Sequence, residues 1–223
     1  DYILPADFKG PARLEILTAD GSVVRVFDSE IIPAQPEARI YFAETWLGEP
    51  EALPAQPGHH RFVWNLRYTP PPTLESFYSI AATPGRPTTI LPEGAYVLPG
   101  NYTVKLTAGG KTITRPLEVT LDPRVDLTQE ELSSLLEFQG QVGSVLERAV
   151  ALHDEIEASN EEAKASPMAE TPSKVAEALT ALAIDLEHSD APPTTSQREL
   201  LDYYRQRYDQ AENQWKGLHV DLN

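Results

Sequence analysis

The sequence predicts an α+β protein, with a small antiparallel β-sandwich over residues 1–124 and an antiparallel three-helix bundle over residues 125–223. Turn-bounded runs of alternating apolar and polar residues fill the first part, whereas apolar residues recur at helical spacing in the second. The composition changes at the same point. Of the 20 prolines, 16 precede residue 125, and the net charge of −16 divides into −3 before that residue and −13 from it onward. We therefore place a domain boundary there.

The strongest β signal is the segment Leu98–Arg124, which predicts a hairpin that closes the first domain. Its first strand alternates apolar with polar residues, the apolar positions being Tyr102, Val104 and Leu106. Gly109-Gly110 predicts the tight turn between the two strands. Pro116 in the return strand indicates an edge position or a bulge, because proline has no N–H to donate to a neighbouring strand.

Two further stretches complete the predicted sandwich. Asp20-Gly21 lies between two β-rich runs and predicts a second hairpin. Residues 58–68 predict a strand with one face inward and the other outward. We expect the outward residues to be Arg61, Val63, Asn65 and Arg67. The residues expected in the core, from this strand and from the hairpin, are Phe62, Trp64, Leu66, Tyr102, Val104 and Leu106.

Three helix starts are predicted in the acidic part. Thr128–Glu131 and Ser196–Glu199 each fit a capping box, and Thr171-Pro172 fits an N-cap followed by a first-turn proline. Apolar residues recur at helical spacing after each start. Gly140 and Gly143 should weaken the first helix by about 1 kcal/mol each relative to alanine, unless close packing compensates.

Composition excludes several classes of site. The chain has no cysteine, so a disulfide, a thiolate zinc site and a cysteine nucleophile are all ruled out. The acidic charge argues against binding to nucleic acid or to anionic membranes, and by itself it is typical of a soluble surface. No apolar run approaches the roughly 20 residues that span a bilayer. We find no nucleotide-binding, metalloprotease or serine-hydrolase motif, and we expect no cofactor.

Two stretches carry a family resemblance. GHHRFVWNLRY at 58–68 and VLPGNYTVKLTAGGKTITRPLEVTLDPRV at 97–125 resemble the region after the β-propeller in bacterial secreted BNR-repeat or sortilin-like proteins, which are often labelled glycosyl hydrolases. That region is an Ig-like module, similar to the Ig-like domain of the flagellar hook-capping protein, and the resemblance extends loosely into the helices. It implies an Ig-like sandwich in a secreted or periplasmic accessory piece. Its job would be to brace the propeller portion of the parent protein or to mediate assembly.

The chain departs from that family because it contains no propeller blades. Neither a Ser-x-Asp-x-Gly-x-Thr-Trp box nor a repeat of roughly 40–50 residues is present. A catalytic surface in such parents would be expected on the propeller, so the resemblance assigns no catalytic residue here. We predict a non-catalytic fragment, although the parent may still be a glycosyl hydrolase.

Two alternatives remain open. A carbohydrate-binding module could stack sugar rings on four aromatic residues, namely Trp46, Phe77, Tyr78 and Tyr96. The purely structural interpretation is that these rings cover the core of the sandwich and bind no ligand. Part of a glycoside hydrolase site could use loop carboxylates, the best set being Glu44, Glu49, Glu51 and Glu75. No metal site is predicted, because the adjacent His59 and His60 would point to opposite faces of a strand.

Overall fold

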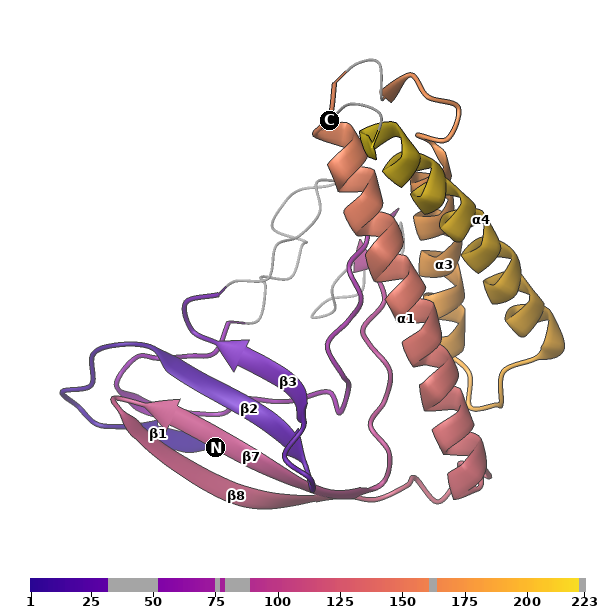
Figure 1. The fold of residues 1–223 in the computed structure, drawn as a ribbon. Helices are drawn as coiled ribbons and strands as arrows, with labels where there is room; N and C mark the ends of the chain where they lie inside the picture. Colours follow the sequence, from indigo (N-terminus) through magenta and orange to yellow (C-terminus); the bar gives the residue numbers. More distant parts are fainter. Residues whose placement is uncertain (32–51, 75–76, 79–88, 161–163, 221–223) are drawn as a thin grey trace.

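The computed structural model describes residues 1–31, 52–74, 77–78, 89–160 and 164–220. Within these ranges the fold is α+β, with antiparallel sheets followed by helices (Figure 1). The strands are β1 (Tyr2–Leu4), β2 (Ala12–Thr18), β3 (Val23–Asp28), β4 (Gly58–His60), β5 (Phe77–Tyr78), β6 (Thr89–Ile90), β7 (Gly100–Ala108) and β8 (Lys111–Val119). The helices are α1 (Gln129–Glu157), α3 (Thr171–Glu187) and α4 (Thr195–Val220).

The main sheet has four antiparallel strands in the order β3-β2-β7-β8. Both predicted hairpins are confirmed: β2 pairs with β3 and β7 pairs with β8. Gly109 and Gly110 have φ values of 55° and 73°, which fits the tight turn that two glycines allow. Pro116 lies in β8 at the edge of the sheet, as its missing N–H predicts. Strands β1 and β4 form a separate pair, as do β5 and β6.

One face of the four-stranded sheet carries a hydrophobic core. Its buried residues are Ala12, Leu14, Ile16, Val24, Phe27, Leu53, Val97 and Tyr102. Phe62, Trp64, Val104 and Leu106 are partly buried and pack against them, so five of the six predicted core residues contribute to this core. We call β1–β4, β7, β8 and the segments that share this core the sheet half.

The predicted strand over residues 58–68 is wrong beyond His60, where β4 ends. The chain turns instead: the Trp64 indole N–H donates to the Arg67 carbonyl at 2.9 Å, and Leu66 has a φ of 61°. This left-handed conformation breaks the inward–outward alternation. Leu66, predicted to be core, is 39% exposed, and Arg67, predicted to point outward, is only 5% exposed.

The helices begin close to the predicted positions. The Thr128–Glu131 capping box is confirmed, with the side chain of each residue bonded to the backbone N–H of the other. At α4 the reciprocal bonds join Thr194 and Gln197 instead of the predicted pair that starts at Ser196. At α3 the N-cap is Glu170, without a side-chain bond, and Thr171 is already helical. Both capping errors are shifts of one or two residues among several adjacent hydroxyl-bearing or acidic side chains.

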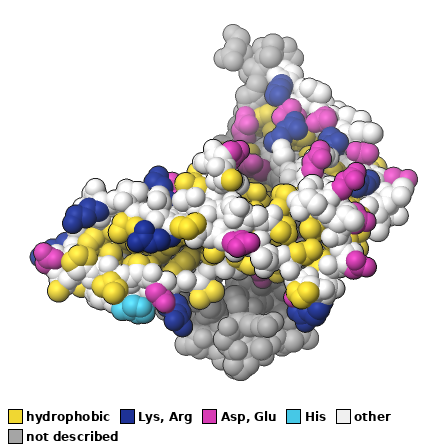
Figure 2. Space-filling model, turned by 90° about the horizontal axis from the view of Figure 1, so that it is seen from below, with side chains coloured by type: hydrophobic (Ala, Val, Ile, Leu, Met, Phe, Trp, Pro, Cys, Tyr) yellow, Lys and Arg dark blue, Asp and Glu magenta, His cyan; other side chains and the backbone are white. Residues whose placement is uncertain are grey.

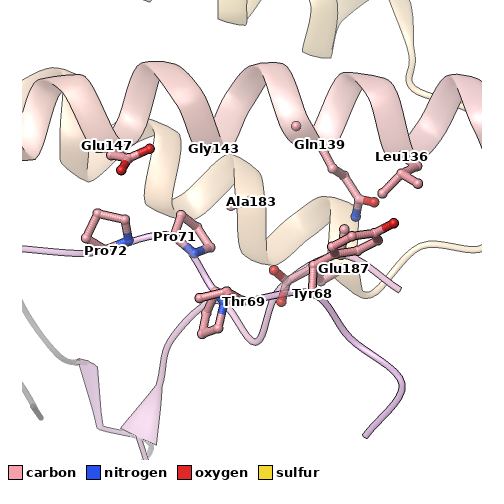
Figure 3. Close-up of a pocket in the computed structure, with 13 residues that line it drawn as sticks. Tyr68, Thr69, Pro71, Pro72, Leu136, Gln139, Gly143, Glu147, Ala183 and Glu187 are labelled. Atoms are coloured by element: carbon pink, nitrogen blue, oxygen red, sulfur yellow. The ribbon is translucent and has the colours of Figure 1, made fainter. Parts of the chain in front are cut away.

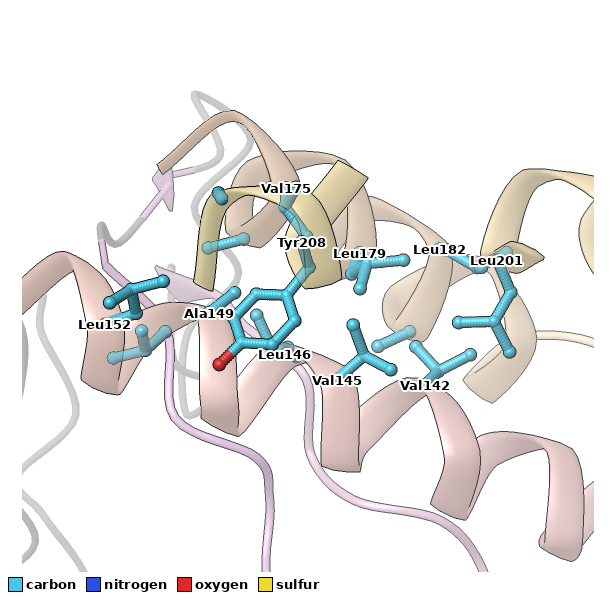
Figure 4. Packing of buried hydrophobic residues seen from close by; sticks show 14 of the residues in the cluster. Val142, Val145, Leu146, Ala149, Leu152, Val175, Leu179, Leu182, Leu201 and Tyr208 are labelled. Carbon is cyan, nitrogen blue, oxygen red and sulfur yellow. The ribbon is translucent and has the colours of Figure 1, made fainter. Parts of the chain in front are cut away.

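The three helices share a second hydrophobic core, seen from close by in Figure 4. Val142, Leu146 and Ala149 on α1 face Val175 and Leu179 on α3, and all five are fully buried. Helix α4 adds the following residues: Leu201, Tyr208, Ala211 and Trp215. We call α1, α3 and α4 the helical half.

Polar contacts join α1 to α4 at the rim of this core. Arg148 lies over the Tyr208 ring, with its Cζ 4.5 Å from the ring centroid, and it also approaches Asp209 and Glu212 at 3.4 Å. The Tyr208 hydroxyl donates to Glu212 at 2.8 Å. Burial, followed by this carboxylate, raises the pKa of Tyr208 to about 12. On the face seen in Figure 2, acidic side chains gather over the helical half, in keeping with the net charge of −13 over residues 125–223.

We predict that Trp64→Ala lowers the free energy of unfolding by about 3 kcal/mol, the lower end for a large aromatic truncation. The side chain is only partly buried, but it packs against the sheet core, lies edge-on to Tyr102 and closes the turn at Arg67. Urea unfolding followed by near-ultraviolet circular dichroism measures the change. Thermal unfolding gives an independent check, and a melting temperature within a degree of wild type would contradict this placement.

Candidate functional site

The two halves meet where the segment Tyr68–Leu74 leaves the sheet half and crosses the helices. Its start is tied to the sheet half by backbone hydrogen bonds, from Tyr68 N to Ala95 O and from Val97 N to Leu66 O, both at 2.9 Å. Its end reaches the other core, because Leu74 packs against the buried residues of the helices. The segment therefore belongs to both halves.

A buried carboxylate on α3 fastens this junction. One Glu187 oxygen accepts the backbone N–H of Glu93 at 2.7 Å, and the other accepts that of Gly94 at 2.9 Å. Its side chain is only 6% exposed. Hydrogen bonds to a charged acceptor are stronger than those between neutral groups. A side chain of the last turn of α3 thus holds a loop of the sheet half.

Arg67 lies next to this carboxylate, and its side chain is as little exposed as that of Glu187. Its Nη1 donates to the Gly94 carbonyl at 2.7 Å and lies 3.8 Å from Glu187, while its Nε lies 3.3 Å from the Glu93 carboxylate. The guanidinium carbon is 3.7 Å from the centroid of the Tyr96 ring, a cation–π contact. Carbonyl, carboxylates and ring together compensate the buried charge. We call Arg67, Glu93, Gly94 and Glu187 the junction cluster.

Only glycine fits at position 94. Its φ is 95°, and a Cβ added there would lie 2.2 Å from the carbonyl oxygen of Tyr68. Side chains larger than hydrogen are therefore excluded both by the backbone conformation and by the close approach of the crossing segment. This contact lets the Glu93–Gly94 amides face α3.

Burial raises the pKa of the Glu187 carboxyl above its ordinary value of 4.5. The two backbone N–H groups and Arg67 act in the opposite direction, and the Glu93 carboxylate adds to the rise. Desolvation prevails because Arg67 is 3.8 Å away and shares its charge with Glu93. The junction therefore holds a carboxylate that folding makes harder to ionise.

A cavity of about 580 Å³ opens beside the junction cluster (Figure 3). One wall is the crossing segment, Tyr68–Pro72, with Ala95 behind it. The other wall comes from α1 and α3, and its residues are Leu136, Gln139, Gly140, Gly143, Glu147, Ala183 and Glu187. The volume is that of a small-molecule site. Chemically it offers an apolar surface with hydrogen-bond acceptors, since Glu147 and Gln139 both line it.

Of the predicted carbohydrate-contact residues, the structure describes the side chain of Tyr96 alone. This ring is 54% exposed, with Arg67 against it. Phe77 and Tyr78 form β5, paired with β6, and their side chains are outside the described part. Trp46 and the carboxylates Glu44, Glu49, Glu51 and Glu75 also lie outside the described residues. Other residues line the cavity described above. Carbohydrate contact through the four aromatic residues therefore stays a prediction.

The adjacent histidines separate, as expected for a strand. His60 Nε2 lies 2.6 Å from the Gln56 carbonyl and its ring packs at a tilt against Tyr2, while His59 is exposed. Within the described ranges, no group of three or more His, Cys, Asp or Glu is arranged to hold a metal ion. Nor is any helix in that part of the chain both long and apolar enough to cross a membrane.

Sequence reasoning missed the junction cluster. Strand alternation predicts an outward position for Arg67, and Glu187 is one of many acidic residues in the helical half. One signal was available. Gly94 follows Glu93 in a loop that precedes a strand, and a glycine there indicates a positive φ or a close backbone approach. Nothing in the sequence relates that loop to a carboxylate 93 residues later.

Comparisons with protein-family models, with curated proteins and with solved structures found no match to this chain.

We predict that Glu187→Ala lowers the free energy of unfolding by about 3 kcal/mol, the lower end for breaking a buried ion pair. Arg67 retains the Glu93 carboxylate, but the amides of Glu93 and Gly94 lose their acceptor. Urea unfolding measures the loss. The matched control is Glu177→Gln, on the exposed face of the same helix, which should change stability little. Equal effects for the two variants would contradict the role of Glu187.

The raised pKa of Glu187 predicts a pH dependence of stability. Because the folded-state pKa lies above the unfolded value, the stability from this group is fully present below about pH 4.5 and is lost as pH rises through the folded-state pKa. The free energy of unfolding of wild type minus that of Glu187→Gln should therefore fall as pH rises from about 4.5 through the raised folded-state pKa. Parallel urea titrations of the two proteins measure it. A difference that grows with pH would show that Arg67 and the amides outweigh burial.

Proposed function

We propose that this chain is a non-catalytic accessory module that braces the β-propeller portion of a secreted or periplasmic, glycosyl-hydrolase-like bacterial protein, or mediates its assembly. In this proposal the sheet half is an Ig-like β-sandwich and the helical half is an antiparallel three-helix bundle. The resemblance of residues 58–68 and 97–125 to the region after the propeller supports the partner. The observation that carries the proposal is the junction cluster.

The junction cluster suits a brace because it joins two separate hydrophobic cores. Burying Arg67 and Glu187 costs desolvation energy, and much of what offsets that cost is contacts between the halves. The Glu187 oxygens are both engaged by backbone amides, so the most buried carboxylate of the junction has a binding role within the fold. A module with one fixed shape can hold a partner without losing conformational entropy at the joint.

Tyr96 favours a second candidate, carbohydrate binding. Its ring is 54% exposed, and aromatic rings stack on sugar faces. Arg67 lies against the ring at 3.7 Å, so the sugar would stack on the face opposite the guanidinium. Loss of sugar binding in Tyr96→Ala would be the mark of this function.

The test is calorimetric titration of the chain against the propeller portion of its parent protein and, separately, against a panel of polysaccharides. We expect the propeller to bind, with affinity reduced about fivefold or more in Glu187→Ala because the loosened halves must be ordered on binding. Glu177→Gln serves as the matched control and should bind as wild type does.

Failure to bind the propeller would overturn the bracing proposal. If polysaccharide binding were found as well, and were lost in Tyr96→Ala, the chain would be a carbohydrate-binding module instead.

A further inference from the structure

We propose that the cavity between the crossing segment and helices α1 and α3 binds a linear aliphatic amine, with its hydrocarbon chain on the apolar floor and its ammonium groups toward the carboxylates. The proposal goes beyond the bracing role and does not depend on it. It rests on the shape of the cavity, on the charge of its walls and on the position of two glycines.

The floor of the cavity suits a flexible hydrocarbon chain. Prolines 70–72 form one side and Leu136 and Ala183 the other, so most of the lining is apolar. Gly143 leaves α1 without a side chain opposite Pro71 (Figure 3), and Gly140 also lines the cavity. A Cβ added at Gly140 would meet nothing within 4 Å, and one at Gly143 would lie 3.9 Å from Pro71. The helix backbone therefore has open space beside it at both positions.

The walls select a cation. Two carboxylates line the cavity, Glu147 and Glu187, and none of its lining residues is lysine, arginine or histidine. Glu147 has an exposed side chain, whereas Glu187 is buried and held by the Glu93 and Gly94 amides. The Tyr68 ring and the Gln139 amide supply a π face and a carbonyl oxygen, both of which an ammonium group can contact. Arg67 lies 3.8 Å from Glu187 but does not line the cavity, so the lining itself offers no cation to an anionic ligand.

The two carboxylates lie toward opposite ends of the cavity, Glu147 beside Pro72 and Glu187 beside Tyr68 and Gln139 (Figure 3). Along α1, the lining from Leu136 to Glu147 rises about 16 Å. An extended amine with a charge at each end would follow this line, with one ammonium group at the exposed Glu147 carboxylate and the other at the opposite end, where the Tyr68 ring and the Gln139 carbonyl line the cavity. A monoamine of similar apolar area could place an ammonium group at only one end of the cavity.

The occupant would also touch both halves, since one wall is the crossing segment and the other is helical. A ligand that binds only the folded, joined form stabilises it by mass action. The site would therefore make the rigidity of the junction depend on the concentration of the amine.

The experiment is isothermal titration of the whole chain with spermidine, hexylamine and hexanol at physiological salt. We expect saturable binding of one spermidine, weaker binding of hexylamine and none of hexanol. Glu147→Gln should weaken spermidine by about fivefold, in line with a partly exposed charge pair. Glu177→Gln removes the same charge from an exposed position away from the cavity and should change nothing.

Two variants that keep the net charge separate the cavity from general attraction to an acidic chain. Gly140→Leu fills the cavity and should abolish saturable binding. Gly143→Ala should weaken spermidine binding while raising helix stability by up to about 1 kcal/mol. This second variant should therefore stay folded even if the leucine of Gly140→Leu disturbs packing. Amide chemical shifts of Tyr68, Ala95 and Gly143 should move with spermidine. Binding that is equal in wild type and in both glycine variants would overturn the proposal, as would shifts confined to other residues.

Discussion

The Glu187 carboxylate is the interaction on which the relation between the two halves depends. It comes from the last turn of α3, yet its hydrogen bonds go to the amides of Glu93 and Gly94 in a loop of the sheet half. Arg67, just before the crossing segment, donates to the Gly94 carbonyl and lies 3.8 Å from the Glu187 carboxylate. Within the described residues, this contact adds hydrogen bonds to the chain connections that link the two hydrophobic cores, among them the crossing segment and residues 120–128.

The junction cluster also explains features that otherwise look unrelated. Leu66 takes a left-handed conformation so that the chain can turn and place Arg67 inward. Gly94 has no side chain because the Tyr68 carbonyl occupies that space. At Gly143 an added Cβ would reach only ordinary van der Waals contact with Pro71, at 3.9 Å, so α1 leaves open space beside the crossing segment. The cavity beside the cluster is what remains between these backbones.

Local order could be predicted from the sequence, and long-range order could not. Two hairpins and one helix cap depend on residues within a few positions of one another, at Asp20-Gly21, Gly109-Gly110 and Thr128. Local sequence patterns therefore predict them. The strand predicted through Leu66 failed because alternation carries no information about where a chain leaves a sheet. The contact of Glu187 with the Glu93–Gly94 loop could not be predicted at all, since it joins segments more than 90 residues apart.

The central claim is that the sheet half and the helical half form one rigid unit, and residual dipolar couplings of the backbone amides test it most directly. A single alignment tensor should fit the couplings of β2, β7, α1 and α3 in the wild-type chain, and separate tensors should be needed in Glu187→Ala. If wild type already required two tensors of different magnitude, the halves would move independently, and the junction cluster would not be what joins them.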